Sequence, residues 1–277
     1  MKKLAFIGCG VMGTALATAA SQSISPDKII VSDIQISKAQ SLASSLNCAV
    51  AKDNREAVQK AQYSVFCVKP QLLKNILLDL REVYSLCKTN QEEKVIISIV
   101  AGVDRMTYMK YLNLNLGDIS FIRCLPNTAC LVGKGYTLVL DDGSYEPFQL
   151  EEYSSMLKAS GKFECLPSFQ FLAGCVLTSA APAFLAMYAN SLADGGVVNG
   201  LLRTQALRLA LEGMQGMVQL ILNDEEKHLE AYKDDICSPA GPTMIGVKTL
   251  EDKGFRSAVI NAVVDAHAIY DMIGSIN

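Results

Sequence analysis

The sequence lacks an excess of basic residues, and this absence limits its partners. Its 277 residues include 25 Lys and Arg against 28 Asp and Glu, giving a net charge of −3. Such a chain has no general attraction for nucleic-acid phosphates, so we expect no nucleic-acid partner. Disorder is also excluded, because 50% of the residues are hydrophobic and only 19% are charged. The length suits one large domain or two ordinary ones.

The residues of a zinc site are also missing. The chain has only two histidines, and its nine cysteines include no C-x-x-C pair. An odd number of scattered cysteines in a chain of this length does not indicate a disulfide framework. We interpret them as reduced, mostly buried thiols of a cytoplasmic protein, and we predict no metal site.

Long apolar runs are absent except at the N-terminus, where Met1-Lys2-Lys3 precedes a run from Leu4 to Ala20 that resembles a signal peptide. Glycines interrupt this run, and the β-branched segment 29–31 follows it, so a strand, a turn and a helix are the better interpretation. No other stretch approaches about 18 uninterrupted apolar residues, and we expect no membrane span.

The first half alternates short β-rich runs with longer amphipathic stretches, which is typical of parallel strands joined by crossover helices. The expected strands are 3–7, 28–32, 63–68, 94–99, 119–123 and 136–140. The expected helices include 11–21, 38–46, 55–61, 71–87 and 105–111. Near-continuous apolar runs such as Val95–Val100 suit strands that are covered on both faces. The pattern predicts an α/β fold with a Rossmann-type doubly wound parallel sheet.

After about Cys165 the β-branched runs become rare, and apolar residues recur at helical spacing, for example Leu209, Met214 and Met217. We therefore predict an α/β domain at 1–164 and an all-helical domain at 165–277. The second domain carries few charges on its apolar helices, which indicates a buried subunit interface.

A G-x-G-x-x-G motif follows the first expected strand and opens the first expected helix: Gly8-Cys9-Gly10-Val11-Met12-Gly13. Gly8 allows the tight turn, Gly10 lets the backbone approach a pyrophosphate, and Gly13 lets helix and strand pack closely. The phosphates would meet the N–H groups at the positive end of the helix. The alternative is that the glycines serve only close packing.

Asp33 ends the next expected strand about 20 residues later, where a carboxylate accepts hydrogen bonds from an adenosine ribose. An acid there repels a 2′-phosphate, so NADH is expected to be preferred over NADPH. The alternative for Asp33 is a solvated loop acid.

Several further motifs carry a resemblance to a known family. They are Val68-Lys69-Pro70-Gln71, residues 97–103, Arg123-Cys124-Leu125-Pro126-Asn127-Thr128, residues 193–197, Ser238-Pro239-Ala240-Gly241-Pro242-Thr243 and Gly254-Phe255-Arg256. Over nearly its whole length the chain resembles the pyrroline-5-carboxylate reductases, the oxidoreductases that complete proline biosynthesis by reducing a cyclic imine with NADH or NADPH.

The resemblance implies a dinucleotide-binding first domain and a helical dimerisation and substrate domain that interlocks with its twin in a homodimer, with rings of dimers as the larger assembly. It places the active site where the nicotinamide of one subunit meets a loop of the helical domain. By matching position, the residues that line the cofactor in addition to the glycine turn and Asp33 are Asn54, Cys67, Val68, Lys69, Pro70, Ala101 and Asn127. For Lys69 the alternative is a surface charge at a strand end.

The resemblance assigns the substrate to one loop: Ser238, Ala240, Gly241, Pro242 and Thr243. Small residues before a new helix suit a carboxylate. The alternative for Ser238 and Thr243 is that they are helix caps. In the family, Thr243 matches a threonine that hydrogen-bonds the ring nitrogen. Glu226 matches an acid near the substrate amine, or is a solvated acid in an acidic run. These two are the implied catalytic residues for hydride transfer to the imine carbon.

Departures from the family pattern leave other activities open. The family has a glycine- and serine-rich segment where this chain has Thr178 to Ala183, and Leu172 and Cys175 replace an aspartate and a threonine. In the substrate loop, Ala240 replaces a glycine and Pro242 removes an N–H group. One alternative is a related imine or amino-acid oxidoreductase with another substrate. A second is a dinucleotide-binding regulator without turnover.

Overall fold

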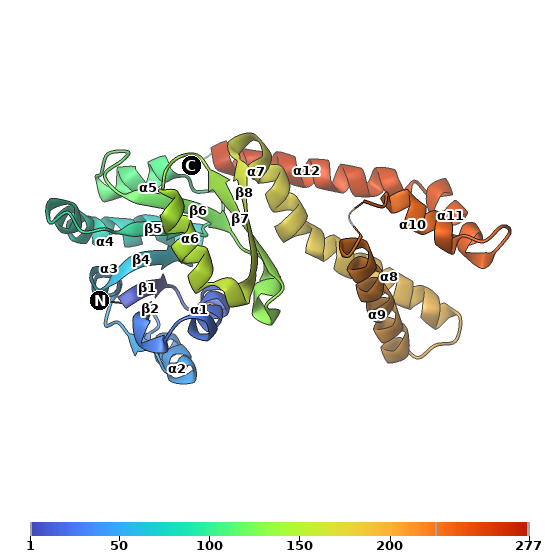
Figure 1. The fold of residues 1–277 in the computed structure, drawn as a ribbon, viewed down its shortest axis with the longest axis horizontal. Helices are drawn as coiled ribbons and strands as arrows, with labels where there is room; N and C mark the ends of the chain where they lie inside the picture. The colour runs from blue at the N-terminus through green and yellow to red at the C-terminus, as the bar shows by residue number, and fades with distance from the viewer. Residues whose placement is uncertain (1, 225, 276–277) are drawn as a thin grey trace. The chain divides into compact units, whose positions relative to one another are not determined.

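The computed structural model describes residues 2–224 and 226–275 (Figure 1). Residues up to Ser179, together with those from His267 onward, form one compact unit, and Ala180–Ala266 form a second. The boundary after residue 164 that we expect from composition lies within a strand of the first unit, β8. β8 pairs with β7, and the division between the two compact units falls after Ser179.

The first unit is built on an eight-stranded sheet of order β3-β2-β1-β4-β5-β6-β7-β8. Its strands are β1 (Lys2–Ile7), β2 (Ile29–Ser32), β3 (Ala49–Val50), β4 (Ala61–Phe66), β5 (Val95–Ser98), β6 (Ser120–Leu125), β7 (Gly135–Asp141) and β8 (Gly161–Pro167). Its helices are α1 (Val11–Ser23), α2 (Ile36–Leu46), α3 (Asn54–Lys60), α4 (Pro70–Thr89), α5 (Arg105–Leu112), α6 (Pro147–Met156) and α7 (Ser168–Cys175). The predicted Rossmann-type fold is confirmed.

The sheet departs from the expected all-parallel arrangement at its far edge. Strands β1 to β6 pair in parallel, β7 runs antiparallel to β6, and β8 is parallel to β7. A parallel connection needs roughly a dozen or more residues, and the segment from Leu125 to Gly135 is too short for one. The sequence pattern missed β3, which is very short, and β8, whose charged and proline residues weaken its strand signal.

Alternate residues of each strand bury against helices on opposite faces. Leu4 and Phe6 of β1 belong to a cluster with side chains of α1, α2 and α6. Ala5 and Ile7 belong to another cluster with side chains of α3, α4 and α5. Because both faces of these strands are buried, the near-continuous apolar runs in the sequence are explained.

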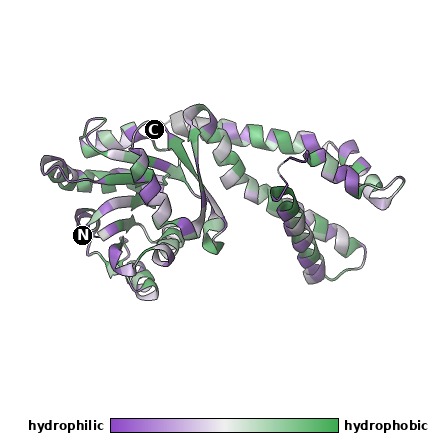
Figure 2. Ribbon diagram, in the orientation of Figure 1, coloured by the Kyte–Doolittle hydropathy of each residue, from purple (hydrophilic) through white to green (hydrophobic). Residues whose placement is uncertain are grey.

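The second unit has little core of its own. Its helices are α8 (Ala181–Val198), α9 (Arg203–Leu222), α10 (Leu229–Ile236), α11 (Pro242–Asp252) and the first part of α12 (Phe255–Ser275), the rest of which belongs to the first unit. Among its described residues the buried ones are Ala189, Ala193, Ala206 and Tyr232. Hydrophobic residues nevertheless recur along α8 and α12 (Figure 2). Met187 and Val198, for example, are 73% and 85% exposed.

The helical run Ser168–Val198 joins α7 to α8 through a π-helical turn, Val176–Ala180. By length and composition this run is long and apolar enough to cross a membrane. The sequence did not predict this, because polar residues interrupt the run. Large exposed apolar side chains of this kind mark a surface that contacts another protein or a membrane.

Candidate active site

In the glycine turn between β1 and α1, backbone contacts leave no room for a side chain at Gly8 or Gly13. Gly8 has a φ of +102°, and a Cβ there would lie 2.8 Å from the carbonyl oxygen of Cys67. A Cβ on Gly13 would lie 2.0 Å from the carbonyl oxygen of Gly8. Both positions therefore require glycine, the first for its backbone and the second for the contact of α1 with the turn.

Gly10 differs, because a Cβ there would meet no described atom within 4 Å. It is exposed and precedes Val11, the first residue of α1. In this described stretch no side chain caps the helix, and its first turn holds no acidic residue. The free N–H groups and the positive end of the helix dipole thus border open space, which fits a dinucleotide pyrophosphate.

Asp33 follows β2 and holds the glycine turn in place. One carboxylate oxygen accepts a hydrogen bond from the backbone N–H of Cys9 at 2.8 Å, and the other accepts one from Gln35, also at 2.8 Å. The bond from Cys9 links the end of β1 to the end of β2, and the bond from Gln35 is local to the loop after β2. An ionised carboxylate has about four acceptor positions, so two remain for a ribose hydroxyl.

The other expected cofactor residues follow the carboxyl ends of neighbouring strands. Cys67 and Val68 come after β4, Lys69 precedes α4, and Pro70 is the first residue of that helix. Ala101 follows β5, and Asn54 begins α3. Since the chain leaves β1 and β4 in opposite directions across the sheet, these loops flank the switch point where such sheets bind ligands. The topology therefore collects these residues along one edge.

Two thiols at this edge are unsuited to nucleophilic chemistry. Burial, with a contribution from Asp33, raises the pKa of Cys9 to about 12. Burial also raises the pKa of Cys67 well above its usual value. Both thiols are therefore protonated near neutral pH and act as small packing groups. No group of three His, Cys, Asp or Glu side chains within 2–224 and 226–275 is arranged to hold a metal ion.

Asn127, after β6, uses its side-chain amide to join distant segments. Its Nδ2 donates to the carbonyl oxygen of Thr178 at 2.8 Å, and its Oδ1 accepts from the backbone N–H of Tyr136 at 3.2 Å. Thr178 belongs to the π-helical turn, within the segment that departs from the family pattern. Asn127 thus positions this turn beside the end of β6, a role that the sequence motif did not indicate.

The expected substrate loop lies in the second unit, directly before α11. The backbone N–H of Gly241 donates to the carbonyl oxygen of Ser238 at 3.0 Å, which closes a turn. Ala240 occupies the left-handed region, with a φ of +58°. Pro242 is the first residue of α11 and Thr243 follows it, exposed. At this described helix start no side chain provides a cap, so neither Ser238 nor Thr243 is explained as one.

Arg256 supports this loop. In the sequence this arginine stands out only as part of the motif Gly254-Phe255-Arg256. Its Nη1 donates to Oε1 of Glu230 on α10 at 2.7 Å, and its Nε donates to Oε1 of Glu251 on α11 at 2.7 Å. The loop joins α10 to α11, so one guanidinium of α12 holds both flanking helices. Glu226 lies apart from the loop in the sequence, exposed in the bend before α10.

Comparison with known proteins identifies the family. A family model described as pyrroline-5-carboxylate reductase dimerisation matches residues 169–271, and one described as NADP oxidoreductase, coenzyme F420-dependent, matches residues 3–102. The chain is 34% identical to the pyrroline-5-carboxylate reductase of Synechocystis sp., covering 96% of each protein. It is 32% identical to that of Escherichia coli, covering 95% of this chain and 94% of the relative. The chain belongs to the pyrroline-5-carboxylate reductase family.

A solved structure of a pyrroline carboxylate reductase from Plasmodium falciparum, described with NADP bound, agrees in fold. Its TM-score is 0.84 at 23% identity, covering 99% of this chain and 98% of the other. The run Ser168–Val198 falls largely within the matched dimerisation region of the reductase family.

Proposed function

We propose that this chain is a pyrroline-5-carboxylate reductase, which reduces the C=N bond of the cyclic imine with NAD(P)H to give L-proline. The observation that carries the proposal is the match to named reductases across nearly the whole chain, glycine turn and substrate loop included. The site also fits the cofactor, because open space lies beside the uncapped start of α1.

When bound, the nicotinamide supplies the hydride, and the protein supplies position and charge. We assign the substrate carboxylate to the free N–H groups at the start of α11, next to Gly241 and Pro242. Thr243 hydrogen-bonds the ring nitrogen, and Glu226 provides a nearby negative charge. A cationic iminium accepts hydride better than a neutral imine, so both residues act by favouring the protonated ring nitrogen.

For the cofactor, we propose that NADH is preferred. Asp33 keeps acceptor positions for a ribose hydroxyl, and its charge disfavours a 2′-phosphate. The relative from P. falciparum is described with NADP, so the preference needs its own test. The ratio of kcat/KM for NADH to that for NADPH is expected to fall in Asp33→Asn. An unchanged ratio would remove Asp33 from cofactor selection.

For the assembly, we propose a cytoplasmic homodimer in which the second unit supplies the interface, with rings of dimers as the larger form. Support comes from the exposed apolar residues of α8 and α12 and from the matched dimerisation model. Sedimentation at micromolar concentration is expected to show a dimer or larger species. A stable monomer would contradict the interface.

The direct test mixes purified protein with NADH or NADPH and pyrroline-5-carboxylate and follows the loss of nicotinamide absorbance. Thr243→Ala is expected to lower kcat by more than about tenfold, or about 1.4 kcal/mol, with dinucleotide affinity unchanged. Thr249→Ala is the matched control, because its hydroxyl donates to the carbonyl of Ile245 within the same helix. If wild-type protein consumes no NADH or NADPH with this imine, the proposed function is wrong.

A further inference from the structure

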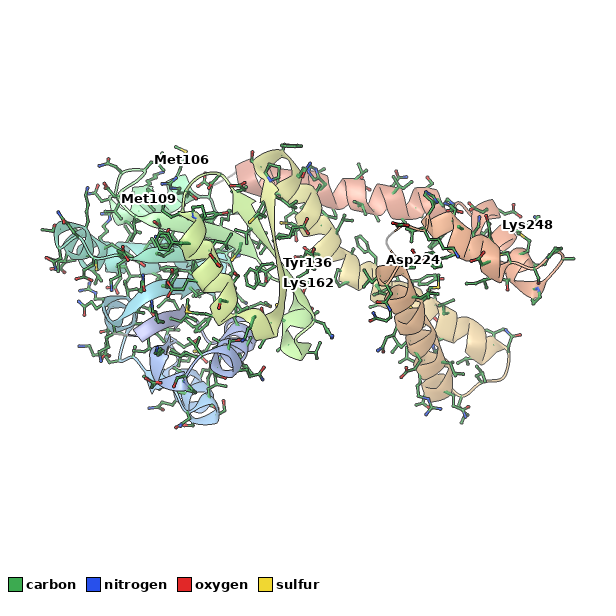
Figure 3. The ribbon with its side chains drawn as sticks, in the orientation of Figure 1. Met106, Met109, Tyr136, Lys162, Asp224 and Lys248 are labelled. Atoms are coloured by element: carbon green, nitrogen blue, oxygen red, sulfur yellow. The ribbon has the colours of Figure 1, made fainter. Side chains whose placement is uncertain are left out.

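A cavity of about 270 Å³ lies in the first unit, away from the glycine turn. Its lining comes from the start of α5, the strands β6 and β7 and the loops beside them: Asp104, Arg105, Met106, Leu116, Phe121, Arg123, Leu140 and Asp142. Met106, at its edge, is labelled on α5 in Figure 3. Pockets for drug-sized ligands run from roughly 300 to 1,000 Å³, so this cavity suits a smaller molecule.

Two guanidinium groups border the cavity without a direct ion pair or hydrogen bond to the rest of the described chain. Arg123 makes no ion pair or hydrogen bond with another described residue, and its one contact of note is the ring of Phe171, 5.5 Å away. Burial lowers the pKa of Arg123, and the charges of Asp104 and Asp142 oppose that shift without reversing it. The Nε of Arg105 is buried and also has no partner within the described chain.

Unpaired guanidinium groups at a cavity favour an anion supplied from outside. The planar fork of arginine matches the two oxygens of a carboxylate, and buried donors without acceptors are costly. Arg55, by contrast, pairs with a carboxylate of the chain itself, that of Asp79 at 2.8 Å. The guanidinium groups of the cavity therefore suit a carboxylate.

The same cavity also carries fixed negative charge. Asp104 Oδ1 accepts from the backbone N–H of Thr107 at 2.8 Å, and Asp142 Oδ1 accepts from that of Ser144 at 3.0 Å. These bonds hold the carboxylates at the cavity while leaving their charges in place. The two arginines of the lining attract a simple anion, but the two aspartates repel it. A zwitterion can place its negative group on the arginines and its positive group on the aspartates.

The remaining wall is apolar, formed by Met106, Leu116, Phe121 and Leu140. Phe121 is fully buried and Leu116 is 59% exposed, so the apolar wall runs from the interior to the rim. We propose that this cavity binds a small α-amino acid with an apolar side chain, its carboxylate on Arg105 and Arg123 and its ammonium facing Asp104 and Asp142. This site is separate from the catalytic residues proposed above.

The test is calorimetric titration of the full-length protein with L-valine and with two analogues. Isovalerate lacks the ammonium group of valine, and isobutylamine lacks the carboxylate. L-Valine is expected to bind at least tenfold more tightly than either analogue. If an analogue binds as well as valine, or if valine does not bind at millimolar concentration, the proposal is wrong.

Variants locate the binding. Arg123→Met and Arg105→Met are each expected to weaken valine binding at least tenfold. Arg55→Met, which removes a surface arginine, and Thr243→Ala, which alters the catalytic loop, are expected to leave it unchanged. Valine binding lost in Thr243→Ala but kept in Arg123→Met would assign valine to the substrate loop and overturn the proposal. Should Arg123→Met fail to fold, Arg105→Met and the analogue comparison still decide it.

Discussion

Substituting Gly10 and Gly13 separately by alanine distinguishes a glycine required by the cofactor from one required by the fold. At Gly13 a methyl group would overlap the carbonyl oxygen of Gly8 at 2.0 Å and would approach the Cβ of Cys67 at 3.1 Å. Neither neighbour is a flexible side-chain end, so the start of α1 must shift. Overpacking of this kind costs about 1–3 kcal/mol.

At Gly10 the same methyl group meets no described protein atom within 4 Å, and the φ of −74° is acceptable for alanine. The folded protein should therefore tolerate it. The methyl group instead occupies space that we assign to the pyrophosphate. We expect dinucleotide affinity to fall by at least tenfold, or about 1.4 kcal/mol.

The assay combines thermal unfolding without cofactor with calorimetric titration of NADH and NADPH. Gly13→Ala is expected to lower the Tm by roughly 2–4 °C per kcal/mol and to weaken binding as well. Gly10→Ala is expected to keep the wild-type Tm and to bind both dinucleotides at least tenfold more weakly. If Gly10→Ala binds both dinucleotides like wild type, the pyrophosphate does not approach this turn and the cofactor site is misplaced.

Other predictions concern stability. Lys94, whose side chain is 1% exposed, donates to the carbonyls of Val58, Gln59 and Ala61 at 2.8–3.0 Å, so Lys94→Met should lower the urea-derived unfolding free energy by about 3 kcal/mol. Lys88→Met removes a surface ion pair and should lower the unfolding free energy by less than about 1 kcal/mol. Equal losses in the two variants would contradict the stabilising role of Lys94. Burial raises the pKa of Cys124 from 9.0 to about 12, so its contribution to stability is complete below pH 9 and declines above it. The decline is about 1.4 kcal/mol per pH unit. Cys124→Ala should remove this part of the fall in unfolding free energy at alkaline pH. An unchanged pH dependence would show that this thiol does not contribute. Ala240→Gly should raise the Tm, because relief of about 1–2 kcal/mol at its left-handed backbone exceeds the entropic cost of about 0.4–1 kcal/mol; a lower Tm would refute the strain.

Local sequence patterns predicted most of the strands and helices whose connecting loops carry the expected cofactor residues. The turn at Gly8 to Gly13 was predicted and the start of α4 was predicted within one residue, at 71 where the helix begins at Pro70, because their signals lie within a few residues of each other. The end of α3 was placed one residue too late. Ala61 is helix-compatible by itself, but it pairs with Lys2 and begins β4.

The features that the sequence did not reveal depend on residues far apart in the chain. Asn127 and Thr178 are separated by 51 positions, and Lys94 and Val58 by 36. The Arg105 and Arg123 cavity likewise forms only where α5 meets β6 and β7. No local spacing announces such contacts, because they exist only once strand order and register have been established.

The sequence by itself determined the Rossmann-type sheet, the dinucleotide turn and the helical second half, since each follows from periodicity or from short-range backbone requirements of glycine and proline. Only the tertiary structure decided the antiparallel edge, the hydrogen bonds of Asp33 and Asn127, and the exposure of the apolar side chains of α8. The reason is physical: chain connectivity sets local conformation, whereas burial and charge pairing depend on which distant segments the completed sheet brings together.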